Sequence, residues 1–158
     1  MLASVTVLRR CLGTATALAL IAASAWATPA GTPLGTWLTQ DGHGVIAIIP
    51  CGDALCGKIA GIDRETAAPM PTDVHGRPQC GLTIITGEKP DADGTWLGEI
   101  TDPRDGSSYR AKLWVDADGN LRLRAFLGIP ALGSTQIWRP FTGHLTNECR
   151  LAGPPAPG

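Results

Sequence analysis

The sequence predicts an all-β fold, a single antiparallel up-and-down barrel of about eight strands. Three observations lead to it. Apolar and polar residues alternate along short runs such as 109–115, the two-residue period of a strand with one packed face. Gly, Asp and Pro separate these runs, and no stretch after residue 34 has the period of an amphipathic helix of ordinary length. Trp37 lies in the first run and Arg139 ends the last, and the two can meet only if the sheet closes on itself.

Residues 1–27 have the pattern of a signal peptide. Arg9 and Arg10 precede a run of small and apolar residues at 11–23, and an Ala-Trp-Ala sequence at 25–27 matches the small-x-small cleavage pattern. We therefore expect cleavage after Ala27 and a mature protein that is periplasmic or secreted. The apolar run is short for a membrane span, so no stable span is expected after processing; a retained single-span anchor is the alternative.

The rest of the chain divides into an N-terminal arm at 28–33, a barrel domain at 34–150 and a Pro-rich tail at 151–158 that is expected to be disordered. Its length suits one domain with one core. Removing the two leader arginines leaves 11 of the 13 Lys and Arg against 14 Asp and Glu, a net charge of −3 instead of −1. With so little Lys and no basic run, nucleic acid is not expected as a partner.

The expected strands follow one another with turn residues between them. They lie near 35–39, 44–49, 55–61, 80–86, 95–101, 107–115, 120–127 and 134–139. The Asp-rich turns at 91–94 and 116–119 end in Gly, which is a strong hairpin signal, and a Pro-led turn occupies 102–106. The two hairpin turns lack the third acidic ligand and the distal Glu of a calcium loop. The segment 62–79 is the longest strandless stretch, and we expect it to cross one mouth of the barrel.

Four cysteines remain after cleavage, and an even number in an exported chain indicates disulfides. Three pairings are possible; we favour Cys51 with Cys56 and Cys80 with Cys149. The first would clip a tight turn, and the second would fasten the segment after the last strand to the barrel wall. A zinc site is the competing interpretation, but the 51–56 spacing is loose for it and the other two cysteines lie singly.

Several short motifs follow one another in order along the barrel domain. They are Gly35-Thr36-Trp37, Cys51 to Ile59, Cys80-Gly81-Leu82, Trp96 to Ile100, Asp102-Pro103, Asp105-Gly106, Tyr109, Leu121 to Arg124, Gly128 and Trp138-Arg139. In this order they resemble the bacterial exported family called domain of unknown function 2147, from about residue 34 to 140. The resemblance implies a lipocalin-like barrel and no established activity. The chain departs from the family's pattern at Ala125, where Gly is expected, and at 74–76.

Trp37 and Arg139 are predicted to close one end of the barrel. A guanidinium lying over the indole would make a cation–π contact between the first and last strands. Their similarity to the Trp and Arg of lipocalin-type barrels favours this structural role over ligand contact.

Tyr109, Arg124 and Phe126 are the candidate ligand-binding residues, because an eight-stranded barrel has room for one small ligand among alternate side chains. If Arg124 faces inward beside Phe126, the pair suits an anion with an apolar body. In the alternative, Leu121 and Leu123 occupy the packed face, so that Arg124 faces solvent and Phe126 lies under a loop.

No arrangement of residues in the sequence points to a catalytic centre, so we expect no enzyme activity, no cofactor and no metal site. We expect an exported barrel that binds a small, partly apolar or anionic ligand in the cell envelope. The second hypothesis is a structural or protein-interaction module whose barrel is filled by its own side chains. The third is an enzyme that uses the 62–79 loop, with Asp73 and His75 as an acid–base pair or metal ligands.

Overall fold

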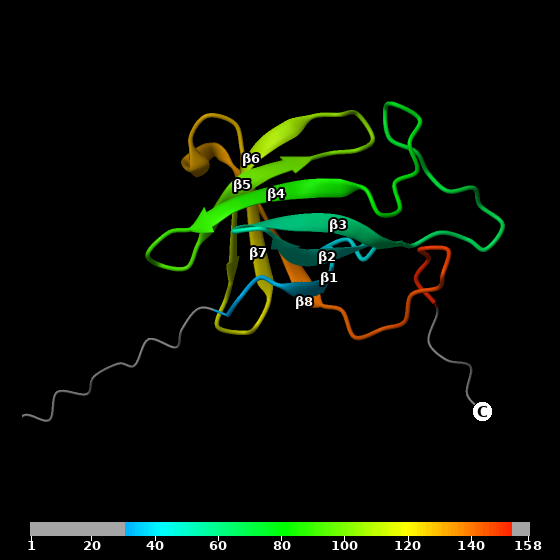
Figure 1. Ribbon diagram of the computed structural model, residues 1–158, viewed down its shortest axis with the longest axis horizontal. Helices are drawn as coiled ribbons and strands as arrows, with labels where there is room; N and C mark the ends of the chain where they lie inside the picture. The colour runs from blue at the N-terminus through cyan, green and yellow to red at the C-terminus, as the bar shows by residue number, and fades with distance from the viewer. Residues whose placement is uncertain (1–30, 153–158) are drawn as a thin grey trace, which may run out of the picture.

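The computed structural model describes residues 31–152 and shows a closed antiparallel barrel in which each strand pairs with its neighbours in sequence (Figure 1). The strands are β1 (Gly35–Leu38), β2 (Gly44–Cys51), β3 (Ala54–Ile62), β4 (Thr83–Pro90), β5 (Trp96–Thr101), β6 (Ser108–Val115), β7 (Leu121–Phe126) and β8 (Ser134–Pro140). A short 3-10 helix, η1 (Pro130–Leu132), lies in the β7–β8 connection. The pairing of β1 with β8 closes the sheet.

The predicted fold class is confirmed, and each predicted run overlaps one strand. The largest difference is at β4, which was expected at 80–86 and begins at Thr83. Residues 80–82 form a turn instead, in which the Gly81 amide donates to the Ile59 carbonyl and the Leu82 amide to the Gln79 carbonyl. Gly81 has a φ of 77°, which a strand does not allow, so the run of apolar residues alone misplaced the start of this strand.

The turns at 91–95 and 116–120 have the chemistry that their sequences predict. Gly94 and Gly119 have φ values of 82° and 79°, in the left-handed region that favours glycine. In the second turn the Asp116 carboxylate accepts hydrogen bonds from the Asn120 amide at 2.9 Å and from Arg122 Nε at 2.6 Å. The hairpin is therefore held by side-chain bonds as well as by the strand ladder.

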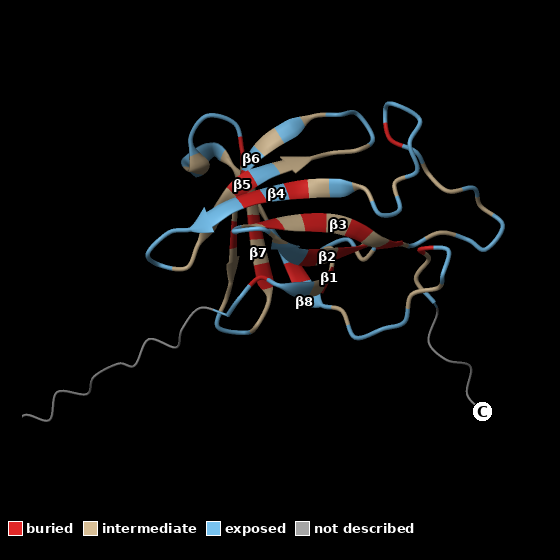
Figure 2. Ribbon diagram, viewed as in Figure 1, coloured by how far each residue is buried: buried red, intermediate tan, exposed pale blue. Residues whose placement is uncertain are grey.

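The connections of an up-and-down barrel alternate between its two ends. The β2–β3, β4–β5 and β6–β7 turns therefore share one end, which we call the closed end. The β1–β2, β3–β4, β5–β6 and β7–β8 connections share the other, which we call the open end. The buried residues lie along the strands between the two ends, as Figure 2 shows. The core cluster consists of Trp37, Ile46, Ile48, Leu55, Ile59, Ile85, Ala111, Leu113, Leu121, Leu123 and Trp138.

Residues before β1 pack against the closed end. Pro33 is buried, and its carbonyl accepts a 2.8 Å hydrogen bond from the indole Nε1 of Trp37, which is only 6% exposed. Gly31 lies against the Val115 side chain at the end of β6. The part of the predicted arm at 31–33 therefore belongs to the packed structure, and residues 28–30 lie outside the described residues.

Close backbone approach on one side of the barrel requires glycine. A Cβ on Gly57 would meet the Ile85 side chain, and one on Gly87 would meet Leu55. A Cβ on Gly98 would meet the backbone of Thr86 on the paired strand, which cannot swing aside as a side chain can. Gly57 on β3 and Gly87 on β4 therefore leave room for Ile85 and Leu55 in the interior, and Gly98 on β5 allows the close approach of the β4 backbone.

The seam between β1 and β8 is short, and it corrects the predicted contact between Trp37 and Arg139. The register pairs Trp37 with Pro140 and Leu38 with Arg139. Directly opposite residues share a face and successive residues alternate, so the indole of Trp37 and the side chain of Arg139 lie on opposite faces of the sheet. Trp37 is buried inside and Arg139 is exposed. Closure therefore comes from backbone pairing, and the expected cation–π contact is not formed.

The C-terminal segment 141–152 packs back on the outside of the barrel. The Leu151 amide donates to the Ile62 carbonyl, and the Ala152 amide donates to the His144 carbonyl. The Leu145 and Leu151 side chains lie against Gly61, where a Cβ would clash with Leu145. Leu151 and Ala152 are thus part of the packed structure, which corrects the predicted start of the tail at 151. Residues 153–158 and the predicted signal peptide at 1–27 lie outside the described residues.

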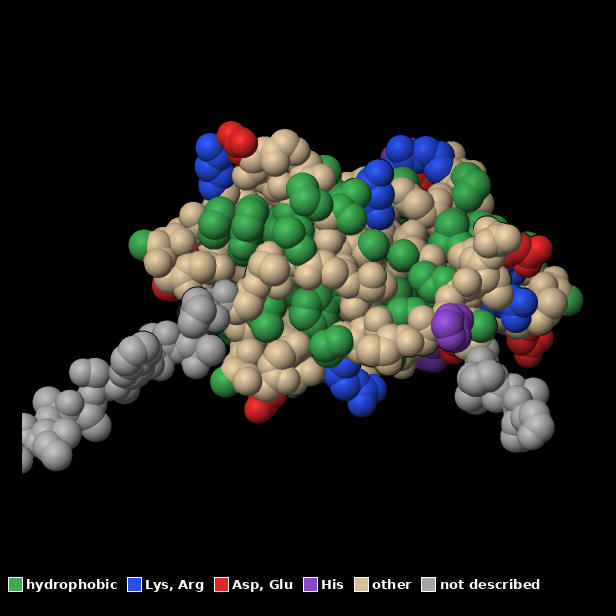
Figure 3. Space-filling view, turned by 60° about the horizontal axis from the view of Figure 1, so that its bottom comes forward, with side chains coloured by type: hydrophobic (Ala, Val, Ile, Leu, Met, Phe, Trp, Pro, Cys, Tyr) green, Lys and Arg blue, Asp and Glu red, His purple; other side chains and the backbone are tan. Residues whose placement is uncertain are grey.

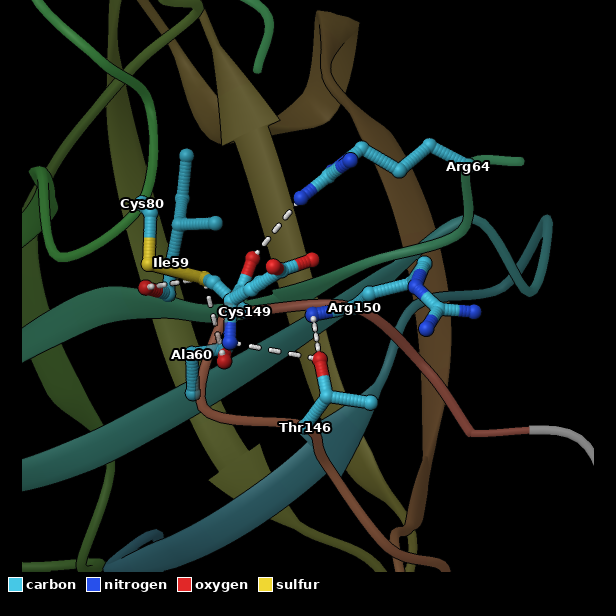
Figure 4. Close-up of a disulfide and its surroundings, with 8 residues drawn as sticks. Ile59, Ala60, Arg64, Cys80, Thr146, Cys149 and Arg150 are labelled. Atoms are coloured by element: carbon cyan, nitrogen blue, oxygen red, sulfur yellow. Dashed lines mark hydrogen bonds between the residues drawn. A yellow bond between two sulfur atoms is a disulfide. The ribbon is translucent and has the colours of Figure 1, made fainter. Parts of the chain in front are cut away.

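The structure pairs Cys51 with Cys56 and Cys80 with Cys149, the pairing that the sequence favours. The first disulfide crosses the β2–β3 hairpin. The second joins the end of the β3–β4 loop to the C-terminal segment beside Ile59 and Ala60 of β3 (Figure 4). Within residues 31–152 no helix is long and apolar enough to span a membrane.

Candidate functional site

The open end of the barrel contains a cavity of about 320 Å³. Its floor is the part of the core nearest the open end, formed by Ile46 of β2, Ile59 of β3 and Leu123 of β7. Its walls carry further apolar side chains, and its rim comes from the connections at this end. The remaining lining residues are Thr39, Asp41, His43, Gly44, Gly61, Ile62, Gln79, Ile84, Ile100, Thr101, Asp102, Pro103, Arg104, Tyr109, Ala125 and Gln136.

The cavity exists because inward positions become smaller or polar toward the open end. On β7 the inward series runs from Leu121 and Leu123 to Ala125, and on β6 it runs from Leu113 through Ala111 to Tyr109. Large aliphatic side chains fill the interior at the closed end, whereas Ala125 and its neighbours leave space above Leu123. A pocket with an apolar floor and a few polar groups at its mouth is the usual form of a small-molecule site.

The charged groups at the mouth are two carboxylates and one guanidinium. Arg104 is bound to Asp102, with Nε 3.0 Å from Oδ1 and a terminal nitrogen 2.6 Å from Oδ2. The Arg104 hydrogen bonds hold the pKa of Asp102 below its ordinary value, and Asp102 raises the pKa of Arg104. Hydrogen bonds from the Thr39 hydroxyl and the His43 amide hold the pKa of Asp41 low as well. Both carboxylates are therefore ionised at neutral pH, and the mouth carries a net negative charge.

Uncharged polar groups also reach the cavity. Gln136 accepts a 2.7 Å hydrogen bond from the indole of Trp138, and Gln79 donates to the Thr72 carbonyl at 3.0 Å. Tyr109, at an inward position of β6, also lines the cavity. Tyr109 is the one predicted ligand-binding residue that lines this space.

Arg124 and Phe126 do not face the cavity, which corrects the prediction that they join Tyr109. The Arg124 guanidinium donates to the carbonyls of Pro130 and Ala131 and to the Thr135 hydroxyl, all beside the β7–β8 connection. Because side chains alternate along β7, these two residues lie on the outer face of the strand, whereas Leu121, Leu123 and Ala125 lie on its inner face. Phe126 is buried on the outer side, where Gly133 lies against it. The alternative interpretation of this strand, with the leucines on the packed face, is the one that the structure shows.

The Asp73 carboxylate in the β3–β4 loop is used within the loop. It accepts hydrogen bonds from the amides of His75 and Arg77, and the Arg77 guanidinium donates to it from Nε at 2.7 Å. Burial raises the pKa of Asp73, but these hydrogen bonds outweigh it, so that the pKa lies below its ordinary value. The ring of His75 is exposed and contributes only its backbone amide to this arrangement. The structure therefore gives Asp73 a structural role, and it shows no acid–base pair with the His75 ring.

Other ionisable clusters are sparse in the described part of the chain. His43 Nδ1 lies 3.3 Å from an Asp63 carboxylate oxygen, but both side chains are exposed. Across residues 31–152 no group of three or more His, Cys, Asp and Glu side chains could hold a metal ion.

Sequence reasoning missed most of the rim. Asp41, Asp102 and Arg104 lie in turns, where each is explained locally as a turn residue. The signal that could have found them is topological: in an up-and-down barrel, every second connection meets at the same mouth. Counting connections from the first strand assigns these turns to the end where the inward residues are smallest.

The protein family follows from a match to residues 35–139, which run from the first residue of β1 to Arg139 in β8. The matching family is DUF2147, described as an uncharacterized protein conserved in bacteria. This chain belongs to it. The DUF2147 domain includes all the lining residues of the cavity and three of the four disulfide cysteines, but not Cys149.

No curated protein and no solved structure matches the chain. The surface of the DUF2147 barrel in Figure 3 carries hydrophobic side chains across the middle of the view and charged side chains mainly toward its margins. The family match gives no activity, so the case for a function depends on the geometry of the cavity.

Proposed function

We propose that this DUF2147 barrel binds a small, partly apolar molecule in the cavity at its open end, in the cell envelope or outside the cell. The cavity of about 320 Å³ above Ile46, Ile59 and Leu123 carries the proposal. Ligand pockets of proteins span roughly 300–1,000 Å³, so this one suits a ligand at the small end of that range. The two disulfides fit an oxidising compartment, in keeping with export.

The charge at the mouth favours an uncharged head group over an anionic one. Arg124, which supported an anionic ligand in the sequence, is held outside the barrel. Asp41 and Asp102 face one guanidinium, Arg104, whose hydrogen bonds Asp102 already accepts. A ligand with an apolar body over Leu123 and a neutral polar group near the Tyr109 hydroxyl satisfies both parts of the cavity.

The test is to fill the cavity and measure the loss of binding. Ala125→Phe places an aromatic ring in the space above Leu123, whereas Ala117→Phe adds the same ring to an exposed turn at the closed end. The uncharged fluorescent probe N-phenyl-1-naphthylamine should bind the wild-type protein and the Ala117→Phe control alike. Its affinity for Ala125→Phe should fall at least about tenfold, because the variant removes the space for its rings.

Thermal unfolding of each variant shows whether the fold is retained. Native mass spectrometry of protein purified from its own envelope adds a second measurement, the mass of any bound molecule. The proposal would be contradicted if wild type and Ala125→Phe bound the probe with equal affinity. It would also be contradicted if the wild type bound neither the probe nor any of a panel of uncharged lipids and alcohols.

A barrel that only mediates protein interactions is the second candidate. Its supporting observation is the closed end, where Trp37, Leu55, Leu113 and Leu121 fill the interior with the chain's own side chains. On this hypothesis the cavity at the other end has no ligand. The two hypotheses are distinguished by the probe: binding that Ala125→Phe removes supports the ligand-binding cavity and contradicts a barrel without a ligand.

A further inference from the structure

The β7–β8 connection exposes the three most accessible large aliphatic side chains among the described residues. Leu127 is 67% exposed, Ile129 58% and Leu132 81%. We call residues 127–132 the apolar loop. It also contains Pro130 and Ala131, and it includes η1, which projects from the top of the barrel in Figure 1. Large aliphatic side chains gathered at this level of exposure mark an interaction site more often than chance exposure of single residues does.

The apolar loop is held in its conformation from beneath. Arg124 donates to the carbonyls of Pro130 at 2.7 Å and Ala131 at 3.1 Å, and to the Thr135 hydroxyl at 2.8 Å. The Leu132 amide donates to the Ile129 carbonyl. Ordering the loop therefore costs little on binding, because its shape exists before contact. This arrangement also gives a use to Arg124, which the cavity does not employ.

Charge around the apolar loop favours an apolar partner. The sequence has no charged residue between Arg124 and Arg139, and Arg124 bonds to the base of the loop. All 13 Lys and Arg and all 14 Asp and Glu of the sequence lie outside this interval or at its ends. On the paired strand β6 the register places Arg110 opposite Phe126 and Lys112 opposite Arg124, and it places Glu99 of β5 opposite Arg110. The nearest basic side chain therefore lies beside an acidic one, and the loop itself carries no charge that would attract acidic groups.

The size of the loop argues against a protein partner of ordinary kind. A stable protein interface buries about 800 Å² on each side, with a flat or complementary surface. Three aliphatic side chains on a projecting turn provide only a fraction of that area. The same shape suits a lipid bilayer, whose interface deforms around a small projection and takes up aliphatic side chains without a matching pocket.

We propose that the apolar loop inserts into the interface of a lipid bilayer and places the barrel on the membrane surface in a reversible manner. Leu127, Ile129 and Leu132 enter the boundary between head groups and acyl chains. Binding depends on apolar burial and not on lipid charge. The proposal is independent of the cavity and stands or falls separately from ligand binding there.

Flotation of the full processed chain with phosphatidylcholine vesicles tests the proposal. The wild-type protein should float with the vesicles and bind equally to vesicles that contain phosphatidylglycerol. The triple variant Leu127→Ser, Ile129→Ser, Leu132→Ser should lose at least about tenfold in the lipid partition coefficient, since burying even one such side chain is worth that factor. The matched control, Ile49→Ser with Val74→Ser, changes two exposed aliphatic residues elsewhere and should bind as wild type does.

A second variant gives a signal that does not depend on loss of binding. Leu132→Trp should increase the partition coefficient, and brominated lipids should quench its added fluorescence. Absence of vesicle binding by the wild type, equal binding by the triple variant, or binding only to anionic vesicles would overturn the proposal. So would analytical ultracentrifugation showing a wild-type dimer that the triple variant abolishes, because the apolar loop would then join two copies of this chain.

Discussion

The two ends of this barrel are built from the same strands and differ in almost everything else. At the closed end the connections are short turns, Pro33 and Trp37 pack over the interior, and large side chains fill it. At the open end the connections include the 20-residue stretch 63–82, and the inward positions hold Ala125, Tyr109 and Gln136. One end therefore provides the packing that stabilises the fold, and the other provides the space and the exposed groups.

This contrast shows how a small barrel can separate the packing that stabilises the fold from the cavity that it leaves at its other end. Burial of large aliphatic and aromatic side chains is the main favourable contribution to folding, and it needs only one filled half. The hydrogen bonds of the strand ladder continue past that half and support the walls of the cavity. Substitutions at the two ends should therefore affect different measurements.

The largest difference between the ends should come from truncating an aromatic residue at each. Trp37→Ala should lower the free energy of unfolding by about 3–5 kcal/mol, because it leaves a cavity at the closed end. The variant also leaves the Pro33 carbonyl without its indole donor. Tyr109→Ala at the open end should cost about 1 kcal/mol, near the centre of the distribution for point substitutions. Urea unfolding measures both, and equal losses would mean that the ends do not differ in packing.

The two disulfides should also differ in how much each stabilises the fold. Loop-closure entropy assigns at most about 4 kcal/mol to the Cys80–Cys149 link and about 2 kcal/mol to Cys51–Cys56, which closes a much shorter loop. Both cysteines of one pair are replaced by Ser in each variant. In urea unfolding, the variant without Cys80–Cys149 should therefore lose more stability than the variant without Cys51–Cys56. Its β3–β4 loop should also be cleaved faster by proteases, because this disulfide ties the loop to the C-terminal segment. A larger loss from the 51–56 pair would contradict the assignment.

Two Asp–Arg pairs make a matched comparison of smaller effect. Asp116 and Arg122 lie at the closed end with side chains 14% and 29% exposed, whereas Asp102 and Arg104 lie at the open end with 26% and 81%. Exposed ion pairs contribute little, because water screens them and ordering the side chains costs entropy. Asp116→Asn should lower the Tm by a few degrees and Asp102→Asn by less. Calorimetry on both variants measures the two decreases in Tm. A larger decrease for Asp102→Asn would show that side-chain exposure does not decide how much each pair contributes.

The same carboxylates give the smallest effect, a dependence of stability on acid pH. Hydrogen bonds from Asn120 and Arg122 hold the pKa of Asp116 below its ordinary value of 3.8. Because the folded pKa is depressed, the stabilisation is complete above about pH 4 and is lost as the pH falls through the folded pKa. The Tm of the wild type should fall between pH 4 and pH 2, and that of Asp116→Asn should fall less steeply. Parallel curves would remove Asp116 from the explanation.

Much of the fold could be predicted from local pattern. Alternation at Tyr109–Val115 and the Gly residues of the hairpin turns predict strands and turns that the structure contains. The start of β4 could not be predicted, because apolar residues at 80–82 fit a strand as well as the turn that Gly81 forms. The seam was half predicted: β1 pairs with β8, but a register that matches Leu38 with Arg139 turns the guanidinium away from the indole.

The candidate site was harder to predict, because it depends on which face of a strand each residue occupies. Arg124 and Phe126 alternate with Leu123 and Ala125, and the sequence allows either set to face inward. Burying an arginine without a partner is costly, whereas outside the barrel Arg124 meets the carbonyls of Pro130 and Ala131. Those carbonyls are positioned only once the loop has folded.

The sequence by itself determined the class of fold and the order of its strands, because strand period and turn chemistry act between residues close together in the chain. Tertiary structure alone decided where the cavity lies, which charges surround it and what Arg124 does. Those outcomes depend on the register of closure and on connections, such as the β1–β2 and β5–β6 turns, that lie far apart in sequence and meet only when the barrel closes.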